Sequence, residues 1–168
     1  MDRPTSEGPA STAGPAAGRL PAVHHPLAVI VVDHGSRRGE SNESMEVFVR
    51  ASAAHLLYPI VEAAHMELAE PSIGTAFDRC VAAGAATVVL APYFLGPGHH
   101  WDRDIPALAA EAAARHPGVG WLVTAPLGPD PLLMDIVERR VEHCLAQVAG
   151  SAGPCPACAG TDRCAFRC

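Results

Sequence analysis

Residues 86–106 read ATVVLAPYFLGPGHHWDRDIP, an apolar run that stops at Pro and Gly and gives way to two histidines. A β-branched, Leu-rich run bounded in this way predicts a buried strand that ends in a functional loop. Residues 28–38 read AVIVVDHGSRR and follow the same plan, with a buried-type strand and then a polar loop that contains His34. Ligands of open α/β sheets bind beyond the carboxyl ends of the strands, so we expect His34 and His100 to face one crevice.

The rest of the chain alternates between strands of this kind and helical patterns. Alternation with short connections predicts one α/β domain, a parallel sheet of about four strands flanked by helices in the order βαβαβαβα. Apolar residues make up 49% of the chain and aromatic residues only 5%, so the core must consist mainly of Ala, Val, Leu and Ile. The expected strands cover residues 28–32, 59–64, 86–92 and 121–125, and the expected helices cover residues 41–55, 72–83, 105–116 and 131–149.

Cap signals place the starts of these helices. We expect Ser41 and Asp104 to be N-caps, and Pro71 suits the first turn of the helix that follows it. Asp130-Pro131 is a strong start signal for a long last helix.

Charge and apolar content exclude several classes of protein. The formal charge of -6 argues against broad binding to nucleic acid or to anionic lipid, since both require a basic surface. No apolar run approaches the roughly 18 residues that a membrane span needs. The phosphate-binding pattern G-x-x-x-x-G-K-[ST] does not occur in the sequence, so we expect no nucleotide cofactor.

The two ends of the chain differ in composition from the centre. Residues 1–26 are rich in Pro, Ala, Gly and Ser without periodicity, which predicts disorder and is compatible with a transit-peptide remnant. The predicted folded domain covers residues 27–150, and a cysteine-rich tail covers residues 151–168. Five of the six cysteines lie in the last 25 residues, a clustering that favours metal ligation over disulfides. The uneven spacing contains one C-x2-C unit and fits an iron–sulfur cluster better than a zinc knuckle.

Polar residues follow three of the predicted strands. His34 follows the first, His65 and Glu67 follow the second, and His99 and His100 follow the third. Neutral imidazoles bind borderline divalent metals and accept protons near pH 7, so two converging histidines predict a metal site with acid–base chemistry. The structural alternatives are a loop cap for His34 and a helix-start contact to a carboxylate for His100.

Four motifs in order, DHGSR, HMELAEPS, PYFLGPGHHWDRDIP and VTAPLG, resemble the short class II chelatases that insert Co or Fe into sirohydrochlorin. The segment VEHCLAQVAG followed by CPACAGTDRC is more narrowly similar to the plant and algal sirohydrochlorin ferrochelatases. The similarity extends over about residues 27–164. It implies a chelatase-like domain that makes sirohaem from sirohydrochlorin and Fe²⁺.

The resemblance also implies roles for single residues. His34 matches the histidine that binds the metal and takes protons, and His100 matches the second metal-binding histidine. Glu67, from its own place near the end of the second strand, is a further proton acceptor or substrate contact, with a helix-dipole partner as the structural alternative. Asp104, at i+4 from His100, would orient that imidazole. Substrate contacts are expected from a set of residues in the loops: Arg37, Ala69, Gly96, Pro97, Gly98, His99 and Trp101.

For the tail, the resemblance implies an iron–sulfur cluster of [4Fe–4S] type, or the [2Fe–2S] form to which it decays. Its ligands would be Cys144, Cys155, Cys158 and Cys164, while Cys168 lies outside the matching motif. A small buried apolar role suits Cys80 better than a reactive one. The resemblance further implies a homodimer in the chloroplast stroma, with a bacterial cytoplasm as the alternative.

Three other functions are consistent with parts of the sequence. One is a cobaltochelatase of corrinoid synthesis that uses the same site, since two histidines do not select Fe over Co. Another is a non-catalytic iron–sulfur or redox-sensing protein whose function lies in the tail. A histidine phosphatase would need Arg before its histidine, whereas Asp33 precedes His34 and would repel phosphate.

Overall fold

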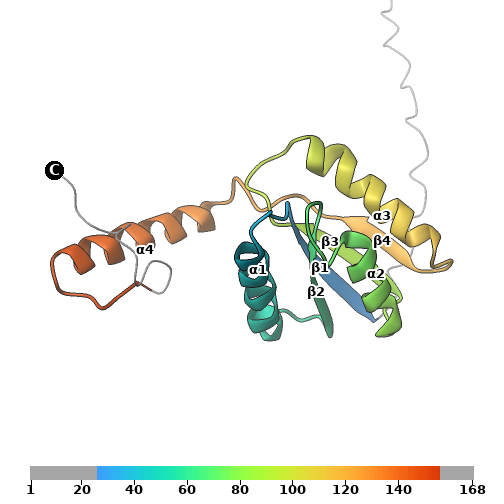
Figure 1. Cartoon of the computed structure of the whole chain (residues 1–168), viewed down its shortest axis with the longest axis horizontal. Helices are drawn as coiled ribbons and strands as arrows, with labels where there is room; N and C mark the ends of the chain where they lie inside the picture. Colours follow the sequence, from blue (N-terminus) through green and yellow to red (C-terminus); the bar gives the residue numbers. More distant parts are fainter. Residues whose placement is uncertain (1–25, 156–168) are drawn as a thin grey trace, which may run out of the picture.

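The computed structural model describes residues 26–155 (Figure 1), and the predictions for residues 1–25 and 156–168 lie outside that range. Its elements alternate as the sequence predicts. The strands are β1 (Leu27–Asp33), β2 (Ile60–His65), β3 (Thr87–Pro92) and β4 (Gly120–Val123); the helices are α1 (Gly39–Ser52), α2 (Ile73–Ala82), α3 (Ile105–Ala114) and α4 (Pro131–Val148). A 3-10 turn, Ala53–His55, follows α1, and a π-helical turn, His100–Asp104, leads into α3.

The four strands form one parallel sheet in the order β2-β1-β3-β4, which confirms the predicted fold class. The carboxyl ends of β1, β2 and β3 therefore meet at one edge. α1 packs on one face of the sheet, where Met45 and Val49 contact Ala63. α2 and α3 pack on the other face around a larger core that includes Ile30, Phe77 and other side chains buried by these helices.

The last helix, α4, projects away from the sheet (Figure 1), and none of its residues is buried. Seven of its apolar side chains are 44–68% exposed, and they are Leu132, Met134, Ile136, Val137, Val141, Leu145 and Val148. No helix within the described part of the chain is long and apolar enough to cross a membrane.

Two of the predicted caps are wrong. α1 begins two residues before Ser41, whose backbone N–H instead bonds the carbonyl of Arg38 at 3.0 Å. Asp104 lies within continuous helical backbone and caps nothing, because its side chain is engaged by His100.

The other start signals are closer to the structure. Pro71 lies just before α2, and Ser72 is the N-cap, with its side chain accepting a hydrogen bond from the Thr75 backbone N–H. Asp130 caps α4 as predicted, by accepting from Leu132 N at 2.9 Å.

Candidate functional site

The segments after β1 and β2 are joined by backbone hydrogen bonds that continue the sheet beyond its strands. Met66 N donates to Asp33 O at 2.8 Å, and Glu67 N donates to His34 O at 3.1 Å. Gly35 turns with φ +83, and a Cβ at this position would overlap the carbonyl oxygen of Glu67. Only glycine tolerates both the backbone angle and the close approach. These bonds hold His34 and Glu67 on neighbouring segments at the sheet edge.

The side chains of His34 and Glu67 form an ion pair. The distance from His34 Nε2 to Glu67 Oε1 is 2.8 Å, and both side chains are about half-exposed. His34 Nδ1 also lies 3.2 Å from the carbonyl oxygen of Gly35. Both ring nitrogens face acceptors, so both contacts are satisfied only when each nitrogen carries a proton. The two contacts together fix the orientation of the His34 ring at the sheet edge.

His100 begins the π-helical turn before α3. Its Nδ1 lies 2.8 Å from Asp104 Oδ2, so the carboxylate accepts the Nδ1 proton and leaves the Nε2 lone pair available. This contact is the orienting role expected for Asp104. The next residue, Trp101, is half-buried and donates its indole N–H to Thr124 O at 2.8 Å. The loop that carries His100 is thereby tied to the segment after β4.

His34 and His100 lie side by side, with ring centroids 5.1 Å apart and an interplanar angle of 74°. The sequence predicted this convergence from strand order alone. Within residues 26–155, no group of three or more His, Cys, Asp or Glu side chains is arranged to hold a metal ion. Two imidazoles at this separation can offer nitrogen ligands to one divalent ion.

The remaining predicted substrate contacts lie in the same loops. Arg37, Pro97, Gly98 and His99 are exposed, while Ala69 and Gly96 are half-buried. A Cβ at Gly96 or Gly98 would meet no atom within 4 Å, so the fold itself does not require glycine there. Open space above this loop is available to a ligand.

The cysteines lie elsewhere. Cys144 is half-buried on α4, Cys155 is only 3% exposed, and Cys158 and Cys164 are outside the described residues. Cys80 is fully buried in the core, and burial raises the pKa of its thiol to about 12. Cys80 is therefore a core residue and not a reactive thiol.

A contact between His65 and Asp33 was missed by the sequence analysis. His65 is the last residue of β2, not part of the loop after it, and its Nδ1 lies 2.6 Å from Asp33 Oδ1. Its side chain is fully buried. The available signal was the parallel register, which sets Asp33 directly beside His65.

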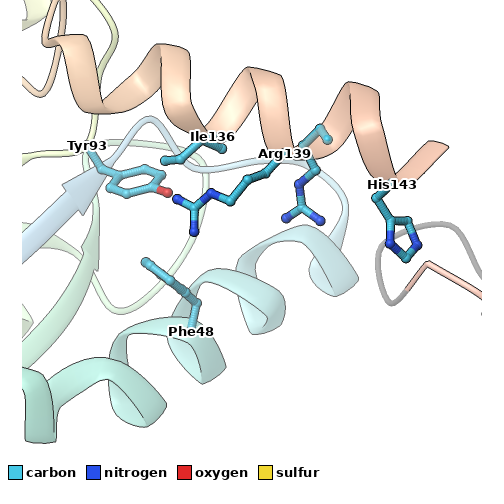
Figure 2. Close-up of a pocket in the computed structure, with 6 residues that line it drawn as sticks. Phe48, Tyr93, Ile136, Arg139 and His143 are labelled. Carbon is cyan, nitrogen blue, oxygen red and sulfur yellow. The ribbon is translucent and has the colours of Figure 1, made fainter. Parts of the chain in front are cut away.

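A cavity of about 490 Å³ lies between α1, the start of the β3–α3 loop and α4 (Figure 2). It does not include the two central histidines. An apolar groove of about 270 Å³ shares Phe48 and Tyr93 with it and reaches Val31 and Ala91 on the sheet. The residues that line the larger cavity are Phe48, Tyr93, Ile136, Arg139, Arg140 and His143.

Comparison with known proteins identifies relatives of this chain. It is 56% identical over 136 residues to the chloroplastic sirohydrochlorin ferrochelatase of Arabidopsis thaliana, covering 81% of this chain and 60% of that protein. The sirohydrochlorin chelatase SirB from Bacillus subtilis subspecies spizizenii, solved in complex with cobalt, has a TM-score of 0.66 at 32% identity, covering 70% of this chain and 50% of SirB. SirB from Bacillus subtilis with Fe³⁺ has a TM-score of 0.61 at 29% identity, covering 77% and 49%.

The chain thus spans about half the length of SirB and 60% of the Arabidopsis protein. A model of the CbiX family matches residues 28–144. The match runs from β1 into α4 and contains His34, Glu67 and His100. The resemblance suggested by the four sequence motifs is confirmed, and the chain belongs to the CbiX family.

Proposed function

We propose that this protein inserts Fe²⁺ into sirohydrochlorin, the step that produces sirohaem. The observation that carries the proposal is the pair of imidazoles at 5.1 Å, each of which has a carboxylate at 2.8 Å. The iron assignment is supported by the sirohydrochlorin ferrochelatase of Arabidopsis at 56% identity. The reaction exchanges one Fe²⁺ for two pyrrole N–H protons, so it needs a place for the ion and acceptors for the protons.

His100 and His34 provide the place for the ion. Asp104 holds the Nδ1 proton of His100, so Nε2 binds the metal. An ion that takes Nε2 of His34 displaces the proton shared with Glu67. Two nitrogen donors hold a borderline divalent ion without trapping it, as thiolates would, so the pyrrole nitrogens can replace them.

Glu67 and His34 provide the acceptors for the protons. When the ion moves to the macrocycle, the His34 imidazole and the Glu67 carboxylate are again free to take protons, and both are open to solvent for their release. The ion stays ferrous throughout, because two protons leave as one divalent cation enters.

The β3–α3 loop is proposed to hold the macrocycle. Gly96 and Gly98 have open space beside them, so the macrocycle can come close to the backbone there. Trp101 is held in place by its hydrogen bond to Thr124 O. Sirohydrochlorin is a polycarboxylate, which a protein of charge -6 repels at long range, so local cations must offset this repulsion. Arg37, exposed in the loop after His34, is one such cation.

The test is anaerobic turnover with sirohydrochlorin and Fe²⁺, followed by visible absorption. His34→Ala and His100→Ala should reduce insertion to the uncatalysed rate, and Glu67→Gln should slow it by about 100-fold, as for loss of a general base. His55→Ala, an exposed histidine on the turn after α1, is the matched control and should retain full activity. A wild type no faster than buffer, or full activity in both central histidine variants, would refute the proposal.

Cobalt insertion is the second candidate, favoured by the similarity to SirB in complex with cobalt. Two imidazoles bind Co²⁺ more tightly than Fe²⁺ by the general affinity order. Turnover at equal free concentrations of the two ions decides between the activities. A higher kcat/KM for Co²⁺ than for Fe²⁺ would support the cobaltochelatase.

We further propose that an iron–sulfur cluster is held by Cys155, Cys158 and Cys164 of the tail, residues 151–168, together with Cys144 from the last helix of the chelatase domain, residues 27–150. The fit can be judged at two of the positions. Cys144 and Cys155 are both withdrawn from solvent, and thiolates are the usual ligands of such clusters. When bound, a cluster would supply one-electron redox chemistry. It has no part in the proposed insertion step, since His34 and His100 lie on other elements.

Anaerobic reconstitution with iron and sulfide tests the cluster by visible absorption and electron paramagnetic resonance. Cys144→Ser and Cys155→Ser should abolish the signals, whereas Cys168→Ser, outside the matching motif, should retain them. A chain ending at Gly150 should still insert metal. A full chain that loads the cluster but shows no turnover would support the redox-sensing alternative.

A homodimer is proposed from the exposed surfaces. α4 buries none of its residues, and Leu122 on β4 is 41% exposed. The apolar groove near Val31 and Ala91 lies on the face of the sheet where α1 packs. A second copy of the chain would cover these exposed apolar surfaces.

Light scattering during size-exclusion chromatography tests this assembly. Ile136→Glu should convert a dimer into a monomer, because it places a charge among the exposed apolar side chains of α4. Glu138→Gln, on the same helix, should leave the mass unchanged. A monomeric wild type at working concentrations would contradict the homodimer.

The chloroplast stroma is the proposed compartment, supported by the chloroplastic relative in Arabidopsis. Import of the radiolabelled chain into isolated chloroplasts tests it, with a chain that starts at residue 27 as the control. A chain that stays outside and protease-sensitive would favour the bacterial cytoplasm.

A further inference from the structure

Asp33 and His65 end neighbouring strands and face each other in register. The Nδ1 of His65 lies 2.6 Å from Asp33 Oδ1, and the His65 side chain is 0% exposed. The Nε2 of His65 is also buried and has no hydrogen-bond partner among residues 26–155. A phenylalanine or leucine would fill this volume without leaving a polar atom unpaired. The single bond to Asp33 is therefore what distinguishes histidine from an apolar residue here.

The same carboxylate oxygen also holds the turn that follows. Asp33 Oδ1 accepts a hydrogen bond from Gly35 N at 3.0 Å, in addition to the contact with His65. The bond between Asp33 and Gly35 spans the one residue between them, which is His34. An oxygen fixed by a fully buried ring is a rigid anchor, whereas a carboxylate on a flexible side chain is not.

We propose that His65 is a positioning residue that sets the place of His34 through Asp33. His65 does not reach the ion or the substrate, since its ring is buried behind Asp33 and the Gly35 turn. By fixing Asp33 Oδ1 it fixes Gly35 N, and so the backbone from which the His34 imidazole reaches Glu67 at 2.8 Å. The inference rests on the proposed role of His34 as a metal ligand.

The chemistry requires this precision. A metal–imidazole bond is about 2.0 to 2.1 Å long and tolerates little displacement of the nitrogen. A misplacement of about 1 Å at a catalytic group typically costs on the order of 100-fold in rate. Two imidazoles from loops after different strands can share one ion only if the position of each nitrogen is held within that tolerance.

The test compares two replacements of the buried ring. His65→Phe keeps the ring but loses the donor, and His65→Asn places an amide N–H where Nδ1 lies. Co²⁺ is the probe, because its visible absorption reports the nitrogen ligands and does not depend on turnover. We expect His65→Phe to weaken Co²⁺ binding about 10-fold or more and to give the spectrum of His34→Ala, as losses of supporting groups do. His65→Asn should restore most of the affinity.

A double-mutant cycle separates positioning from general stability. On the His34→Ala background, His65→Phe should cause no further loss of Co²⁺ affinity, because it acts through the missing imidazole. On the His100→Ala background it should still cause a loss. Equal losses on both backgrounds, or a wild-type spectrum in folded His65→Phe, would overturn the inference.

Asp33→Asn provides a second route should His65→Phe fail to fold, since it keeps the size of the side chain and weakens both bonds of the shared oxygen. It should lower Co²⁺ affinity in the same way, and wild-type affinity in this variant would also overturn the inference. If the wild type binds Co²⁺ through His34 but inserts no metal, the chelatase proposal fails while the positioning role stands.

Discussion

The side chains at the sheet edge of β1 and β2 are held by contacts within the domain, whereas the apolar side chains of helix α4 are exposed. At the sheet edge, polar side chains are few and each is fixed by a neighbour, as His34 is by Glu67 and Asp33 is by His65. Along α4, many apolar side chains are exposed and none is buried. The polar side chains at the sheet edge are therefore held by neighbours within the domain, while α4 presents apolar side chains that the described part of the chain leaves exposed.

Gly35→Ala should have the largest effect on stability, because Gly35 lies where the segments after β1 and β2 are hydrogen-bonded to each other. The substitution forces φ +83 on a residue with a Cβ and pushes that Cβ into the carbonyl of Glu67. Strain and overlap together should lower the free energy of unfolding by on the order of 3 kcal/mol. Urea denaturation measures the change.

Gly39→Ala is the control for this glycine, since a Cβ there meets no atom within 4 Å. It should be neutral or slightly stabilising. Equal stability of the two variants would mean that the segments after β1 and β2 are not locked together.

Asp104→Ala tests the same edge at the third strand. Without the carboxylate that holds Nδ1, His100 loses its fixed orientation, and Co²⁺ affinity should fall by about 10- to 100-fold. Titration calorimetry measures the affinity. Asp102→Ala removes an exposed carboxylate from the same turn and should leave Co²⁺ binding intact. An equal loss of affinity in both variants would mean that the loss comes from the change in net charge and not from the orientation of His100.

Removal of α4 should matter much less to the rest of the domain. Because this helix buries none of its residues, a chain ending at Asp130 should unfold within about 1 kcal/mol of the full chain, at concentrations where the full chain is monomeric. Denaturation at those concentrations provides the measurement. A loss of several kcal/mol would mean that α4 belongs to the same cooperative unit as the sheet.

The smallest effect is expected at a surface contact between α2 and α3, remote from both regions. Asp78 contacts His116 at 2.6 Å and Arg115 at 2.9 Å, and these partners hold the pKa of its carboxyl below the ordinary value of 3.8. A depressed pKa contributes stability that is present above the unfolded value and is lost as the pH falls through the folded value.

The Tm should therefore drop more steeply for the wild type than for Asp78→Asn as acid is added below about pH 4. The pair is half-exposed, so the difference should stay near 0.5 kcal/mol, about the value of a surface ion pair. Thermal scans of both proteins across this pH range measure the difference. An equal fall of Tm with pH in the two proteins would contradict the lowered pKa of Asp78.

Much of the fold and of the site could be read from the sequence because its signals are local. Strand patterns ending at Pro and Gly located the loops, and parallel topology then brought His34 and His100 together. The bond between Asp33 and His65 was missed because it depends on the register of two strands, which no local pattern encodes. The contact between Asp104 and His100 was expected from their i, i+4 spacing, whereas the π-helical turn that carries both residues was not.

The start of α4 was also predicted, from Asp130-Pro131, but the surroundings of the helix were not. A start signal places a helix in the sequence and leaves open what covers its faces.

If the proposed function is correct, the hydrogen bond from Trp101 to Thr124 O makes the segment after β4 relevant to substrate choice, although the polar side chains of the site follow the other three strands. A change in length or sequence between β4 and α4 would shift the carbonyl of Thr124, and with it the indole and the adjacent His100. An engineer who wished to admit a bulkier macrocycle could therefore vary this connection and keep every metal-binding side chain unchanged.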